Sequence, residues 1–159
     1  MCADRVTPEQ RSKIMAQVKG KNTKPEMIVR SLCHAMGLRF RLHRRDLPGT
    51  PDLVFPKHRL CLFVHGCFWH RHGCKYASTP KTRPEYWTQK LDTNAMRDER
   101  CINKLKLMDW RVDVIWECEL KDLDRIKERI QLLTSTNCRS AKSGELASVA
   151  NRTISALPS

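Results

Sequence analysis

The 159-residue sequence predicts an α/β fold in which a mixed central sheet is flanked by helices. Apolar runs of strand length are interspersed with longer segments of helical period, and no internal repeat interrupts them. The hydrophobic fraction of 40% and the charged fraction of 30% are typical of a globular protein. A chain of this length is sufficient to bury the core of one domain.

Two helices and one strand are expected in the N-terminal third. A capping box formed by Thr7 and Gln10 begins the first helix. Thr23 caps the second helix and Gly37 ends it. Its expected apolar stripe consists of Ile28, Leu32 and Ala35. Residues 38–44 alternate apolar and basic side chains, which predicts a half-exposed strand.

The remaining elements follow in a regular order. A turn leads into a short strand at Asp52, and the apolar run at residues 58–66 suits a central strand. A long helix begins near Pro84, followed by a strand at 110–118 and a closing helix at 122–133. From Ser135 the composition is typical of a poorly ordered tail. We therefore divide the chain into an arm at 1–22, a domain at 23–134 and a tail at 135–159.

The charge of the chain points to a polyanionic partner. Thirty Lys and Arg against seventeen Asp and Glu give a net charge of +13, which attracts nucleic acid. A basic surface that serves only solubility is the alternative. No apolar stretch is long enough for a membrane span, and the first ten residues lack the apolar core of a signal peptide. We expect a cytoplasmic protein with no membrane partner.

Soft metal ligands are concentrated in FVHGCFWHRHGC, residues 63–74. Cys67, His72 and Cys74 have a spacing that lets a folded loop converge on one zinc ion. Cys118, at the end of a predicted strand, is the best candidate for the fourth ligand. The rivals for this position are Cys101 and His70. Four protein ligands would leave no open position, so such a zinc is structural. The alternative is free cysteines and surface histidines.

A second group of residues suits hydrolytic chemistry. Asp52 at a strand start and Glu26 in the preceding helix form a plausible Mg²⁺ site, although an aspartate after proline is often a turn residue. His65 and His70 flank the metal loop, and either imidazole has the right chemistry to activate water or protonate a leaving oxygen. In a polyanion-binding protein this combination favours phosphodiester hydrolysis.

Three aromatic residues lie near the metal loop. Phe68 and Trp69 follow Cys67 directly, and Trp87 lies in the long helix. These side chains are either part of the core or a wedge that stacks between bases.

The stretches PGTPD, FVHGCFWHRHGC, TRPEYW, NAMRDER and DWRVDVIWEC, in this order, resemble the very short patch repair (Vsr) DNA mismatch endonucleases. The resemblance covers about residues 8 to 134 and rests mainly on HGCFWH with its downstream His and Cys. It implies a restriction-endonuclease-like fold with a structural Zn²⁺, and a Mg²⁺-dependent enzyme that nicks 5′ of the thymine in a T·G mismatch.

The resemblance also implies a biological setting. T·G mismatches arise when 5-methylcytosine deaminates, which links such an enzyme to a cytosine-5 methyltransferase and to mismatch-repair proteins. The partner is then double-stranded DNA. The implied protein is a bacterial monomer of the cytoplasm that joins the nucleoid when it binds DNA.

Position by position, the resemblance assigns Asp52 and the backbone carbonyl of Val64 to Mg²⁺. It assigns His65 and His70 to catalysis, with His70 as the water-activating base, and Glu26 to support of the site. The structural zinc is assigned to Cys67, His72, Cys74 and Cys118. DNA contacts are assigned to Phe68, Trp69, Trp87, Met15, Lys90 and Asn94.

One departure concerns the acidic-x-Lys pair of the wider superfamily. Here it reads Phe63-Val64-His65, and the Vsr enzymes also have His at the third place. Relatives often carry Thr at the position of Val64, but a backbone carbonyl does not depend on the side chain. Two alternatives stay open: a non-catalytic zinc-stabilised nucleic-acid-binding module, and a restriction-type nuclease for matched DNA.

Overall fold

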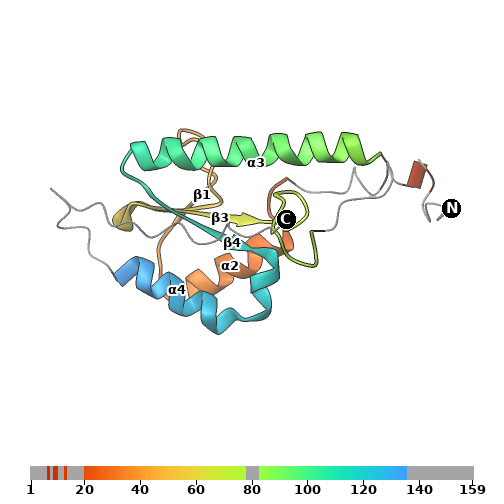
Figure 1. Ribbon diagram of the computed structural model, residues 1–159. Helices are drawn as coiled ribbons and strands as arrows, with labels where there is room; N and C mark the ends of the chain where they lie inside the picture. Colours follow the sequence, from red (N-terminus) through yellow and green to blue (C-terminus); the bar gives the residue numbers. More distant parts are fainter. Residues whose placement is uncertain (1–6, 8, 11–12, 14–19, 78–82, 136–159) are drawn as a thin grey trace, which may run out of the picture.

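A mixed four-stranded sheet forms the centre of the computed structural model, which describes residues 7, 9–10, 13, 20–77 and 83–135 (Figure 1). In sheet order, the strands are β1 (Arg41–Leu42), β2 (Leu53–Phe55), β3 (Leu60–His65) and β4 (Arg111–Trp116). The β1–β2 and β2–β3 pairs are antiparallel, and β3–β4 is parallel. The predicted α/β class with a mixed sheet is confirmed.

Helices cover both faces of this sheet. Helix α3 (Pro84–Leu107) lies along one face, and α2 (Lys24–Ala35) and α4 (Leu123–Ser135) lie along the other (Figure 1). Two short 3₁₀ turns complete the fold, η1 (Pro56–His58) after β2 and η2 (Glu117–Lys121) after β4. Every residue of β3 is buried, as a strand between two layers of helices requires.

Two apolar clusters make up the core, one on each face of the sheet. Alternate side chains of β3 divide between them, since successive residues of a strand point to opposite faces. Leu62 packs toward α2 and α4, whereas Cys61 and Phe63 pack toward α3. By the same alternation His65, the last residue of β3, points to the α3 face, where the catalytic candidates gather.

Two details differ from the sequence-based expectation. The strand predicted at 38–44 shrinks to Arg41–Leu42, an edge pair with both side chains exposed. The predicted apolar stripe of α2 is confirmed only in part: Leu32 is half-buried and packs against the core, Ile28 is half-buried, and Ala35 is exposed. The buried face of α2 consists of Glu26, Val29, Arg30 and Cys33. Glu26 and Arg30 tolerate burial there because they form an ion pair with each other at 3.0 Å.

The predicted helix starts are confirmed where the structure describes them. The Thr7 N–H donates to Gln10 Oε1 at 3.0 Å, and the Gln10 N–H donates to the Thr7 hydroxyl oxygen at 3.3 Å. The two bonds form a complete capping box. The Thr23 hydroxyl accepts from the Glu26 N–H and caps α2. Met15 and residues 136–159 lie outside the described residues, so the divisions at 22 and 134 stay predictions. Among the described helices, none combines the length and the apolarity needed to cross a membrane.

Candidate active site and zinc-ligand cluster

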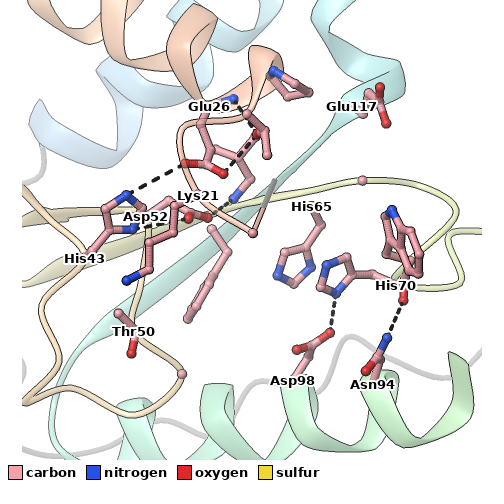
Figure 2. A pocket seen from close by; sticks show the side chains of 18 of the residues that line it. Lys21, Glu26, His43, Thr50, Asp52, His65, His70, Asn94, Asp98 and Glu117 are labelled. Carbon is pink, nitrogen blue, oxygen red and sulfur yellow. Dashed lines mark hydrogen bonds and ion pairs between the residues drawn. The ribbon is translucent and has the colours of Figure 1, made fainter. Parts of the chain in front are cut away.

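One cavity of about 990 Å³ contains the side chains that the sequence singles out for catalysis. Its walls come from the segment before α2, the loop before β2, the end of β3 and the middle of α3. Figure 2 shows two groups of side chains facing it, namely Glu26, His43 and Asp52, and His65, His70 and Asp98. The fold thus brings the predicted aspartate and both predicted histidines to one site from different elements.

Asp52 enters this cavity from a tight turn packed against α3. Gly49 has a φ of +74°, and a Cβ there would lie 2.9 Å from the Cβ of Cys101, so only glycine fits. The Asp52 Oδ2 accepts a hydrogen bond of 2.8 Å from the backbone N–H of Val64. Burial raises the pKa of Asp52 to about 6, against the opposing effect of that N–H, and the charge of Glu26 adds to the rise. A bound cation would relieve this cost.

The residues present fit a magnesium ion. The β2–β3 pairing ends at Leu53 and Leu62, so Val64 lies beyond it, where its N–H donates to Asp52. The backbone carbonyl of Val64 is the second oxygen that the resemblance assigns to the ion. A carboxylate oxygen beside a carbonyl oxygen is a donor set that Mg²⁺ prefers, with waters and phosphate oxygens in the other positions.

Glu26 lies beside Asp52, but its oxygens already have partners. Oε2 accepts from the backbone N–H of Asn22 at 2.9 Å and from the Arg30 guanidinium at 3.0 Å, and Oε1 accepts from the Thr23 hydroxyl at 2.9 Å. The residue is buried, with an exposed fraction of 4%. This bonding suits the supporting role predicted for Glu26 better than direct metal ligation.

His70 and Asp98 form a hydrogen-bonded pair across the cavity. The Nδ1 of His70, in the loop after β3, contacts the Oδ2 of Asp98 on α3 (Figure 2). Burial raises the pKa of Asp98, but the hydrogen bond and charge of His70 outweigh it and lower the pKa overall. An ionised carboxylate only accepts, so Nδ1 carries the proton and Nε2 of a neutral ring is free to take one. This is the arrangement of a general base with its orienting partner.

His65 supports this pair from the adjacent strand. Its ring stacks on that of His70 with centroids 3.8 Å apart and 7° between the planes. Burial, and then the charge of His70, lower the pKa of His65 to about 4. The imidazole is therefore neutral at physiological pH. The structure separates the two predicted histidines into a buried neutral ring and a ring paired with a carboxylate.

The predicted zinc ligands converge in a second cluster. One ligand atom from each of four residues lies within 4.8 Å of every other, and these residues are Cys67, His72, Cys74 and Cys118. Three thiols and one imidazole at this spacing suit a tetrahedral zinc ion. Cys118, the sequence's first choice as fourth ligand, lies with its Sγ 3.4 Å from the Nδ1 of His72. The rivals Cys101 and His70 lie outside this cluster.

Burial alone would raise the pKa of the Cys74 thiol. Hydrogen bonds from the Tyr76 backbone, His72 and the other two cysteines instead lower that pKa to about 7. Burial raises the pKa of the other two thiols, Cys67 and Cys118, that of Cys67 to about 12. Cys74 is therefore the thiol that most readily forms the thiolate that binds metal. The loop also reaches the catalytic residues, because the His72 ring stacks on Trp116 at 4.3 Å and Trp116 meets the edge of His65 at 5.4 Å.

The three aromatic candidates form a cluster outside both cores. Phe68 contacts Trp69 and Trp87 with ring centroids at 5.0 and 5.5 Å, and the two tryptophans lie 6.1 Å apart. All three are half-buried, and none belongs to either core cluster. They are neither fully packed nor isolated on the surface. Each side chain is thus partly exposed, and Trp69 lines the cavity.

The structure also places the other DNA-contact candidates on α3. Lys90 is exposed, and the side-chain amide of Asn94 donates to the Trp69 carbonyl at 3.3 Å, which ties the aromatic loop to the helix. Sequence reasoning missed two site residues. Asp98 follows Asn94 by four positions and lines the same cavity, but an acidic residue on a charged helix gives no signal that separates it from the surface. His43 had no signal either, because its position depends on a turn.

Known proteins resemble this chain over most of its length. Residues 3–76 match the family described as DNA mismatch endonuclease Vsr. Type II nicking enzyme V.XorIIP of Xanthomonas oryzae pv. oryzae is 56% identical over 128 residues, 80% of this chain and 94% of that protein. DNA mismatch endonuclease Vsr of Escherichia coli is 40% identical over 118 residues, 74% of this chain and 76% of that protein.

A solved structure agrees at the level of the fold. The catalytic domain of homing endonuclease I-Bth0305I matches with a TM-score of 0.51 and 21% identity. The match covers 74% of this chain and all of that domain. That match concerns the fold alone. The identities to the two relatives above extend over most of both sequences and lead to one assignment. The chain belongs to the DNA mismatch endonuclease Vsr family.

Proposed function

We propose that this endonuclease uses Mg²⁺ to nick one DNA strand on the 5′ side of the thymine in a T·G mismatch. The observation that carries the proposal is the convergence of Asp52, His65 and the His70–Asp98 pair on one cavity beside the aromatic cluster. We further propose a restriction-endonuclease-like domain with a structural zinc, acting as a monomer. Its substrates would arise by deamination at sites of a cytosine-5 methyltransferase, for completion by mismatch-repair proteins.

The aromatic cluster supports recognition of a mismatch. A T·G wobble pair stacks poorly, so unstacking beside it costs less than at a matched step. Phe68, Trp69 and Trp87 offer ring faces that can replace the lost stacking. Selectivity then comes from the energy of deforming the duplex. Lys90 is exposed on α3, and we propose that its ammonium group contacts a phosphate.

The proposed chemistry divides among the side chains of the cavity. When bound at Asp52 and the Val64 carbonyl, Mg²⁺ stabilises the negative charge that develops on the phosphate. His70 accepts the proton of the attacking water at Nε2, while Asp98 holds its ring by Nδ1 and stabilises the imidazolium. His65 buttresses the ring of His70 through their stack. The water oxygen bonds to phosphorus as the P–O bond on the opposite side breaks, and the leaving oxygen takes a proton from solvent water, so a phosphate end and a hydroxyl end remain.

One duplex comparison tests this proposal. Duplexes of one sequence with a central T·G, T·A or C·G pair are labelled on each strand and incubated with Mg²⁺. We expect a single nick, 5′ of the thymine, in the T·G duplex alone. Cutting of both strands of matched DNA would favour a restriction-type nuclease. Tight binding without any cut would favour the non-catalytic module.

Replacing Asp98 with asparagine should lower the single-turnover nicking rate by about 10² to 10⁴-fold. The amide no longer stabilises an imidazolium, and it can hold the wrong tautomer of His70. The matched control is Asp92→Asn, which removes an exposed carboxylate of α3 that pairs with Arg71 of the loop. DNA affinity should change in neither variant. Equal losses of rate in the two variants would contradict a specific role for Asp98.

The nicking rate should also fall as the pH drops through about 6 at low Mg²⁺. The pKa of Asp52 is raised to about 6, so below this value the carboxyl is protonated and cannot bind a cation. Because Mg²⁺ and the proton compete, each tenfold increase in saturating Mg²⁺ should lower the midpoint by about one unit. Rates are measured from pH 4.5 to 8 at several Mg²⁺ concentrations. A midpoint independent of Mg²⁺ would rule out Asp52 as the titrating ligand.

A further inference from the structure

His43 lies between the carboxylates of Glu26 and Asp52, and the mechanism above gives it no role (Figure 2). Its Nε2 lies 3.9 Å from Glu26 Oε2, and its Nδ1 lies 3.9 Å from Asp52 Oδ1. The backbone of His43 has a φ of 45°, in the left-handed region that few non-glycine residues adopt. The chain accepts a strained backbone at the residue whose ring separates two carboxylates, and such strain concentrates at functional sites.

The hydrogen bonds around His43 determine which ring nitrogen carries the proton. A guanidinium nitrogen of Arg30 lies 2.8 Å from Nε2. Guanidinium groups only donate, so Nε2 must accept, and the proton of a neutral ring then sits on Nδ1. Burial, and then the charge of Arg30, lower the pKa of His43, which agrees with a neutral ring. The protonated nitrogen is therefore the one that faces Asp52.

We propose that His43 is a positioning residue for Asp52, whose carboxylate it orients through Nδ1–H. The inference rests on the proposed function, because it takes Asp52 as the carboxylate that binds the divalent cation. Val64 donates its N–H to Oδ2 at 2.8 Å, and the Nδ1 of His43 faces Oδ1 at 3.9 Å, beyond hydrogen-bond distance. When this contact shortens, two donors fix the plane of the carboxylate. The 3.9 Å separation is long, as catalytic contacts often are before metal and substrate bind.

The same hydrogen bonds argue against His43 as a metal ligand. A ligating imidazole nitrogen must be unprotonated, but Nδ1 keeps its proton while Nε2 accepts from Arg30. The fixed charge of Arg30 also disfavours a cation beside the ring. Instead, Arg30 of α2 contacts both Glu26 and His43, and His43 faces Asp52. These contacts connect α2 to the proposed metal site.

Two substitutions separate the hydrogen bonds of His43 from its bulk. In His43→Gln the amide can accept from Arg30 and donate to Asp52, whereas His43→Leu does neither. Glutamine and leucine are similar in size, and neither favours a left-handed backbone, so the backbone strain at position 43 is the same in the two variants. The readout is Mn²⁺ binding to the zinc-loaded, DNA-free protein by titration calorimetry. His34→Leu, which alters an exposed histidine packed on Phe40, is the control.

We expect His43→Leu to weaken Mn²⁺ binding about 10 to 100-fold, and His43→Gln to retain most of the affinity. In nicking assays the Mg²⁺ concentration for half-maximal rate should rise by the same factor in His43→Leu, with KM for the duplex unchanged. His34→Leu should match the wild type. If His43→Leu does not fold, His43→Ala against His43→Asn makes the same comparison, since asparagine keeps an amide donor.

Asp52→Asn distinguishes failure of this inference from failure of the proposed function. If wild type and Asp52→Asn bind Mn²⁺ equally, the proposed metal site is wrong and the role of His43 falls with it. If Asp52→Asn loses the ion but His43→Leu binds as the wild type does, only the role of His43 is overturned. Equal weakening in His43→Leu and His43→Gln would also overturn it, because packing alone would then explain the loss.

Discussion

Replacing Asp52 with asparagine is expected to lower the nicking rate on a T·G duplex by about 10³-fold or more, while DNA affinity remains. Asparagine can still accept the hydrogen bond from the Val64 N–H, but it lacks the charge that holds Mg²⁺. DNA affinity in a chain of net charge +13 comes mainly from phosphate contacts, which this substitution does not remove. Single-turnover nicking and fluorescence anisotropy measure the two quantities separately.

The same substitution should stabilise the protein without added Mg²⁺. The pKa of Asp52 is raised from 3.8 to about 6 in the folded state by burial first. Above pH 6 the carboxylate is charged in the folded and in the unfolded state, so the folded state bears the full cost of burying that charge. Near pH 4 the group is mostly protonated in the folded state and the cost becomes small. The free energy of unfolding of Asp52→Asn should exceed that of the wild type by on the order of 1 to 3 kcal/mol at pH 7.5. The difference should shrink at pH 4.5.

Asp46→Asn provides the matched control for both measurements. Asp46 belongs to the same loop but is exposed and pairs with Arg44 at the surface. We expect neither the nicking rate nor the stability to rise or fall appreciably. An Asp52→Asn variant that still nicks at a tenth of the wild-type rate would contradict the metal-binding role. One that unfolds more readily would contradict the burial penalty.

The layout of the fold was predictable from local patterns, but one buried helix face was not. The apolar run of β3 and the cap at Thr23 are local signals, and both appear where expected. The prediction of the buried face of α2 failed because Glu26 and Arg30 are charged, and a search for regularly spaced apolar residues leaves charged residues out. Their burial depends on an ion pair and on His43, which lies 13 residues beyond Arg30. No local period contains that information.

In the candidate site, too, some residues were predictable from sequence and others were not. Cys118 could be proposed from sequence as a ligand at a strand end, although β4 ends at Trp116 and Cys118 lies in η2, two residues farther on. Asp98 was missed because a single acidic residue on a charged helix looks like surface, and only the loop after β3 reveals its partner. Thus the residues of the motif and Cys118 near a strand end were predictable, whereas the pairing of His70 with Asp98 required the structure.

Removing one zinc ligand should have the second large effect. The purified wild type is expected to contain one zinc per chain by atomic emission, and Cys118→Ser should contain little or none. Because metal binding contributes directly to folding, the melting temperature should fall by on the order of 10 °C. Cys101→Ser is the control: Cys101 is equally half-buried but lies outside the four-ligand cluster, so zinc content should stay at one.

Nicking should be lost in Cys118→Ser well below its new melting temperature, because ring contacts join the candidate zinc ligands to the candidate catalytic histidines. His72 stacks on Trp116, Trp116 meets the edge of His65, and His65 stacks on His70. Releasing His72 therefore loosens the wall against which the general base is held, and the loop that carries the aromatic cluster is released with it. A Cys118→Ser variant that lacks zinc but nicks at the wild-type rate would show that the loop needs no metal to hold this geometry.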